Sequence, residues 1–104
     1  MRILKALIGK MDGTLDEIGF YATQAHVLHA TNKDLADTYE KVGEMHVEIY
    51  RMLHGRVVEL IDAERKSGRE PPKGMVEMWQ YEHERLVKEF LLAKNALEEY
   101  KKSY

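Results

Sequence analysis

The chain contains no cysteine, which excludes disulfide scaffolds, thiolate zinc sites, iron–sulfur clusters and cysteine nucleophiles. No apolar run exceeds four residues, whereas a membrane-spanning helix needs about 20, so no membrane partner is expected. The formal net charge is only −2, and such a balance gives no reason to expect a nucleic-acid partner. A phosphate-binding glycine loop and a Gly-x-Ser-x-Gly motif are also missing, and the chain is therefore predicted not to be an enzyme.

What is present indicates a small globular protein. Hydrophobic residues make up 44% of the chain and charged residues 33%, so the chain can bury a core. Its 104 residues predict a single domain, 1–104. Lys5 and Lys10 interrupt the first apolar stretch, which argues against a secretory signal and leads us to expect a cytoplasmic location.

Apolar residues recur at steps of three and four in three long segments, 4–29, 35–61 and 75–100. The residues Thr-Asn-Lys-Asp at 31–34 carry side-chain oxygens that can cap a following helix. Gly68 can end the second segment, and Pro71-Pro72 suit the first turn of the third. The expected fold is all-α, an antiparallel bundle of three long helices of ferritin-like or up-down type.

The first segment contains an ambiguity at Asp12-Gly13, a dipeptide typical of turns. Thr14 and Glu17 then match a capping box, which would start a new helix after a break near Gly13. The apolar stripe continues through this point without a change of phase, which favours one kinked helix. Gly9 and Gly13 share a face, where they either let another helix approach closely or are tolerated toward solvent.

A metal site is one hypothesis for the end of the first segment. His26 and His29 lie one helical turn apart, and Asp37 follows shortly after the expected turn. Two neutral imidazoles with a carboxylate suit zinc or a similar divalent ion, the only cofactor that this pattern suggests. The plainer alternative is two partly exposed histidines near a helix end, where a protonated ring also favours the helix dipole.

Turn counting also places His54 within about one turn of His83, with Asp12 at a similar height on the first helix. These three residues form a conceivable catalytic or metal-binding cluster. The alternative is that each histidine lies at the edge of the core and bonds to a neighbouring polar group.

The third segment carries more apolar surface than a three-helix bundle needs. Val87 and Leu91 form a second stripe beside the one that contains Phe90. A soft cluster, Met75, Met78 and Trp79, opens the same segment, and methionines suit adaptable contacts. These six residues are therefore predicted to form an interface, either between copies of the chain or with a protein partner.

The segment 32–39, Asn-Lys-Asp-Leu-Ala-Asp-Thr-Tyr, with Leu53-His54 and Pro71-Pro72 further on, resembles small ferritin-like helical proteins of bacteriophages and prophages. The resemblance runs from about residue 11 to the C-terminus. Those relatives carry a glutamate before a Tyr-Ala pair in the first helix and a Glu-x-x-His in the second. Here the places read Phe-Tyr-Ala at 20–22 and His-Val-Glu-Ile at 46–49, so the resemblance implies the bundle without its metal ligands.

These observations predict a non-enzymatic, phage-type helical protein that acts through protein–protein contacts. The contacts would either join copies of the chain or assemble or inhibit another protein. A phage origin would place the protein in the host cytoplasm and would admit an inhibitor of a host factor or defence system. The alternative function is a metal-binding ferritin-like protein that uses histidines and carboxylates.

Overall fold

A computed structural model describes residues 2–66 and 73–104 of the chain, and within these ranges every regular element is a helix. The helices are α1 (Arg2–Leu28), α2 (Lys33–Lys66) and α3 (Lys73–Ser103). The prediction of an all-helical chain with three helices is confirmed. The predicted breaks at Gly68 and Pro71-Pro72 lie outside the described residues. No helix in the described ranges is both long enough and apolar enough to cross a membrane.

α1 is continuous through Gly13, so the alternative of a break at this point is wrong. The Thr14 hydroxyl donates a hydrogen bond to the Lys10 carbonyl, at 2.7 Å, four residues back along the same helix. The threonine therefore does not cap a new helix. Apolar residues before and after Gly13, such as Met11 and Leu15, are both buried, and their packing favours an unbroken helix over the local turn signal.

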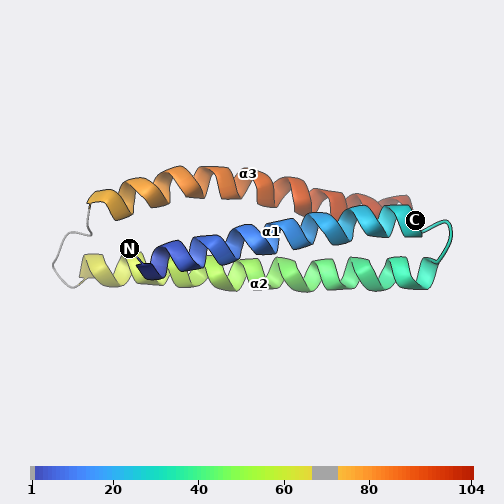
Figure 1. Ribbon diagram of the computed structural model, residues 1–104, viewed down its shortest axis with the longest axis horizontal. Coiled ribbons are helices and arrows are strands. Elements are labelled where there is room, and N and C mark those ends of the chain that lie inside the picture. The colour runs from blue at the N-terminus through green and yellow to red at the C-terminus, as the bar shows by residue number, and fades with distance from the viewer. Residues whose placement is uncertain (1, 67–72) are drawn as a thin grey trace.

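The turn between α1 and α2 is closed by Asn32. Its side-chain Oδ1 accepts a hydrogen bond from the Leu35 amide at 3.1 Å, and its carbonyl accepts from the Ala36 amide at 3.0 Å. This is an N-cap, and the predicted capping role of residues 31–34 is confirmed. Beyond the turn, α2 runs back alongside α1, and α3 later returns in the direction of α1 (Figure 1).

The described chain forms a rod with extents of 57 × 21 × 18 Å. The long dimension follows from α2, whose 34 residues span about 51 Å at 1.5 Å per residue. α2 and α3 both pack along α1, whereas they make few contacts with each other. α1 is therefore the central element, and the two other helices leave room between them.

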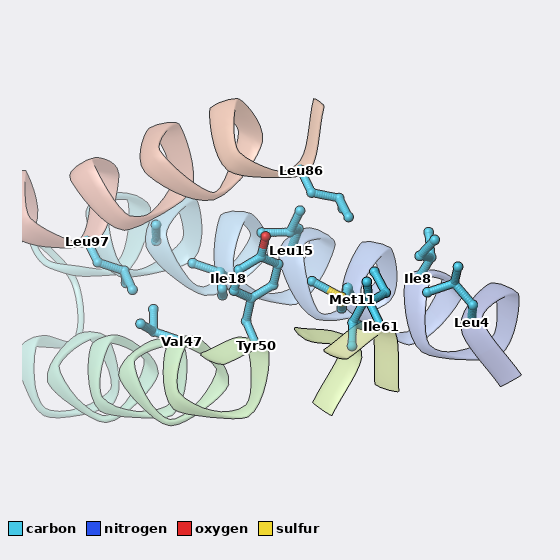
Figure 2. Close-up of a cluster of buried hydrophobic side chains, with 12 residues drawn as sticks. Leu4, Ile8, Met11, Leu15, Ile18, Val47, Tyr50, Ile61, Leu86 and Leu97 are labelled. Carbon is cyan, nitrogen blue, oxygen red and sulfur yellow. The ribbon is translucent and has the colours of Figure 1, made fainter. Parts of the chain in front are cut away.

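The core consists of two apolar clusters, a small one of Ala25, Ala36 and Tyr100 and a larger one. The larger cluster follows α1 along most of its length (Figure 2). α1 presents its buried residues at helical spacing, and the other two helices cover them with fewer buried side chains. The buried members of this cluster are Leu4, Ile8, Met11, Leu15, Ile18, Ala22, Val47, Tyr50, Val57, Ile61, Leu86 and Leu97.

The closest approach at a glycine occurs at Gly43 of α2. A Cβ atom added there would lie 2.7 Å from Cδ2 of Leu97, a buried side chain of α3. At Gly9 and Gly13, by contrast, an added Cβ would meet no described atom within 4 Å. The alternative of close helix approach at those two glycines is therefore wrong, and they face open space.

Candidate functional site

Two adjoining hollows lie between α2 and α3, with volumes of about 420 and 360 Å³. They are lined by residues between 40 and 54 of α2 and between 83 and 101 of α3, and Arg51 lines both. We call them together the α2/α3 groove. The groove exists because both helices pack on α1 and touch each other at few places.

The smaller hollow is largely apolar. Its floor is an aromatic stack of Tyr50 from α2 and Phe90 from α3, with ring centroids 4.4 Å apart and an angle of 11° between the rings. Val87 and Leu91 complete this side of the hollow, and Leu91 is 50% exposed. Tyr50 is buried, and burial raises the pKa of its phenol. Its hydroxyl has no hydrogen-bond partner among the described residues.

Two histidines face each other at one end of the same hollow. Nε2 of His54 lies 3.2 Å from Nε2 of His83, and the ring centroids are 5.3 Å apart. The ring of Trp79 covers the pair, at 4.9 Å from His83 and 5.9 Å from His54. Partial burial lowers the pKa of His54, and the neighbouring His83 adds to this effect. The expected proximity of the two histidines is confirmed.

The third member predicted for that cluster is elsewhere. Both carboxylate oxygens of Asp12 accept hydrogen bonds from the guanidinium of Arg85, at 2.8 and 2.9 Å. The prediction that Asp12 joins His54 and His83 is therefore wrong. The guanidinium of Arg85 binds the carboxylate of Asp12 more strongly than an imidazole would, because it donates two parallel charged hydrogen bonds.

The larger hollow is polar and contains a buried carboxylate. Glu40 is 5% exposed, and its Oε1 lies 3.6 Å from Nζ of Lys101 without a hydrogen-bond partner in the described part of the chain. Burial raises the pKa of Glu40, and the adjacent carboxyl group of Glu44 raises it further. Lys101 instead hydrogen-bonds Glu44 and lowers the pKa of that residue. One lysine thus lies beside two carboxylates, Glu40 and Glu44.

The six residues predicted as an interface are divided by the structure. Val87, Phe90 and Leu91 line the α2/α3 groove. Trp79 lies beside the histidine pair, and Met78 packs, partly buried, against the core. The side chain of Met75 lies outside the described residues. Whether any of them contacts a partner stays a prediction.

The predicted metal ligands His26, His29 and Asp37 do come together, but around a tyrosine. The hydroxyl of Tyr100 donates to Oδ1 of Asp37 at 2.8 Å and lies 3.4 Å from Nδ1 of His29. The ring of His26 meets that of Tyr100 edge-on at 5.5 Å. Nζ of Lys33 donates a hydrogen bond to the second carboxylate oxygen of Asp37, at 3.1 Å. In the described ranges, no group of three or more histidine or carboxylate side chains is placed to hold a metal ion.

This tyrosine cluster is electrostatically coupled. Burial raises the pKa of Tyr100 to about 12, and the hydrogen bond to Asp37 contributes to the shift. The same hydrogen bond lowers the pKa of Asp37, as does Lys33. The group therefore holds a carboxylate and a neutral phenol at neutral pH, and it ties the start of α2 to the end of α3.

Sequence reasoning missed Glu40 and its contact with Lys101. One signal could have found it, because Glu40 follows Ala36 by four residues and precedes Val47 by seven, on the buried stripe of α2. A charged residue on such a stripe requires a partner. The identity of that partner is not encoded locally, since Lys101 is on another helix.

Comparison with protein-family models, with curated proteins and with solved structures finds no match to this chain.

Proposed function

We propose that this protein is non-enzymatic and acts through helical protein–protein contacts, by pairing with a second copy of itself over the α2/α3 groove. The observation that carries the proposal is the open apolar hollow of about 360 Å³, where Leu91 stands half exposed beside Val87 and the Tyr50–Phe90 stack. Grouped apolar side chains at the mouth of a concave surface are typical of contact sites.

Burial of these side chains supplies the driving force. Each large aliphatic side chain that leaves water contributes roughly 1.5–3 kcal/mol. In a two-fold dimer every such residue is buried twice, once on each copy. Leu91 lies at the edge of the groove. In the dimer, Leu91 of each chain would therefore pack into the smaller hollow of the other chain.

The charges beside the groove favour an identical partner. Glu48 pairs with Arg51 on α2, and Lys94 pairs with Glu98 on α3. Each helix therefore offers both signs of charge, already balanced within its own surface. Two such surfaces meet without net repulsion, whereas a groove bordered by one sign would repel a copy of itself.

The fold supports the same reading. We take the three helices as an antiparallel, ferritin-like bundle of phage type, on the resemblance of segment 32–39. Bundles of this kind commonly contain four helices. Because α2 and α3 make few contacts, the groove between them has room for a fourth helix, which the second copy would supply.

Light scattering on the full chain tests the proposal. We expect a dimer or larger species at micromolar concentration, and monomer after Leu91→Glu, which places a charge at the mouth of the hollow. Leu92→Glu is the matched control, since Leu92 is 72% exposed and does not line the groove. It should leave the oligomeric state unchanged. Helical circular dichroism should persist in both variants.

A wild-type chain that is monomeric at this concentration would overturn self-association. A dimer that survives Leu91→Glu would show that the chain pairs through another surface. Loss of the helical signal in Leu91→Glu alone would place Leu91 in the core, contrary to its exposure.

A further inference from the structure

His54 and His83 bring two metal-ligating nitrogen atoms together in the α2/α3 groove. Their Nε2 atoms lie 3.2 Å apart, on two helices that otherwise make few contacts. In the absence of an ion, this distance suits a hydrogen bond in which one neutral ring donates and the other accepts. Two imidazole nitrogens that converge at this distance can also chelate.

We propose that His54 and His83 form a binding site for one divalent transition-metal ion of the zinc, nickel or copper class. A metal–imidazole bond is about 2.0–2.1 Å long. An ion at that distance from both nitrogens makes an N–metal–N angle of about 100°, given the separation of 3.2 Å. This value lies between the right angle of an octahedral site and the tetrahedral angle, so the separation of the two nitrogens suits a single ion.

The surroundings suit an ion with open coordination positions. Both histidines line the hollow of about 360 Å³, which in a single chain admits water molecules or an external ligand to the remaining positions. Trp79 shields the opposite side of the rings.

The arginine in the hollow does not prevent binding. Arg51 lines the same hollow, but its guanidinium pairs with Glu48 at 2.5 Å. The predicted histidines at the other end of the rod are less suitable, because His29 stacks on Tyr104 at 3.6 Å and His26 lies against Tyr100. With two protein ligands, the expected affinity is micromolar rather than that of a closed structural site.

Trp79 supplies a direct readout, because it is the only tryptophan in the chain and lies 4.9 Å from the ring of His83. Titration of the full-length protein with Cu²⁺ or Ni²⁺ should quench its fluorescence with a stoichiometry of one ion per chain. Zn²⁺, which does not quench, should compete and reverse the effect. Quenching should weaken as the pH is lowered, because protonated imidazoles do not bind metal.

Single substitutions test which histidines bind the ion. His54→Gln and His83→Gln should each weaken the apparent affinity at least tenfold, whereas His26→Gln and His29→Gln should leave it unchanged. Circular dichroism establishes that each variant is folded. A wild-type protein that is not quenched by 100 μM Cu²⁺ would overturn the site, as would equal quenching in folded His54→Gln. A loss confined to His26→Gln or His29→Gln would overturn it in favour of the tyrosine cluster.

The metal site and the proposed dimer can fail separately. Cu²⁺ quenching is measured on wild-type protein at a series of protein concentrations, and light scattering gives the oligomeric state at each. An apparent affinity that stays constant as the monomer fraction changes supports a site contained within one chain. An affinity that is lost together with the dimer would overturn the two-histidine site as stated, because a second copy would then be required.

Discussion

Asp12 of α1 and Arg85 of α3 form a two-pronged ion pair, with Nη1 2.8 Å from Oδ1 and Nη2 2.9 Å from Oδ2. The same guanidinium bonds Glu82 and Glu89 of its own helix. Asp12 and then Glu82 raise the pKa of Arg85 above its ordinary value, so the fork is always charged. A planar fork matches a carboxylate in one geometry only, and the pair therefore helps to set the register of α3 against α1.

Replacement of Arg85 should show how much its ion pair with Asp12 contributes to the free energy of unfolding. Arg85→Lys keeps the charge but loses the parallel hydrogen bonds, and we expect the free energy of unfolding to fall by about 1 kcal/mol. The estimate is modest because the side chains of Arg85 and Asp12 are 35% and 40% exposed. Urea unfolding followed by circular dichroism measures the change. Arg56→Lys, in an exposed pair with Glu59, is the control, and an equal loss there would contradict a special role for the fork.

Tyr100→Phe removes the hydroxyl that joins Asp37 to His29, and should lower the free energy of unfolding at pH 7. Tyr81→Phe is the control, because Tyr81 is 72% exposed. Chemical or thermal unfolding of both variants against wild type makes the comparison. Equal stability of the two variants would show that the hydroxyl of Tyr100 exchanges its partners for water without loss.

The same variant has a pH signature. The pKa of Asp37 lies below its ordinary value of 3.8, chiefly because Tyr100 donates to the carboxylate. A carboxyl whose pKa is lower in the folded state stabilises the fold above pH 4, and this contribution is lost as the pH falls through the folded pKa. In Tyr100→Phe the pKa of Asp37 should rise toward 3.8, as carboxyl NMR titration can measure. The stability difference from wild type should then shrink in acid, and a difference independent of pH would contradict this coupling.

Alanine substitutions at Gly9 and Gly43 should change the free energy of unfolding in opposite directions. Gly9→Ala faces open space and should raise the free energy of unfolding by about 0.5–1 kcal/mol through helix propensity. Gly43→Ala gains the same propensity but places Cβ 2.7 Å from Cδ2 of Leu97, so this buried side chain must shift within the core. We expect Gly43→Ala to be at least about 1 kcal/mol less stable than Gly9→Ala. Equal gains at both sites would mean that Leu97 repacks without strain.

Tyr50→Phe should stabilise the protein. The hydroxyl of Tyr50 is buried and lacks a partner among the described residues, and an unsatisfied buried polar group costs about 1–3 kcal/mol. Removing it leaves the ring stacked on Phe90. Urea unfolding should show a gain of about 1 kcal/mol. A loss of similar size would instead show that the hydroxyl bonds to a water molecule in the groove.

The helices and their capped turn could be predicted from the sequence, because the interactions that form them are local. The apolar spacing in 4–29 and 35–61 reports which face of each helix is buried, and this pattern needs no knowledge of the partner. The cap at Asn32 depends on atoms within four residues of it. Local signals were misleading at Thr14, where a capping motif competes with an apolar stripe that α1 buries without interruption.

Only the tertiary structure decided which side chains meet across helices. Asp12 and Arg85 are 73 residues apart, and Glu40 and Lys101 also lie on different helices. Turn counting estimates height along a bundle, and it placed His54 near His83 correctly. It does not give the rotation of each helix about its axis, which depends on how all core side chains fit together. That rotation brings Asp12 to Arg85, and it leaves the groove between α2 and α3.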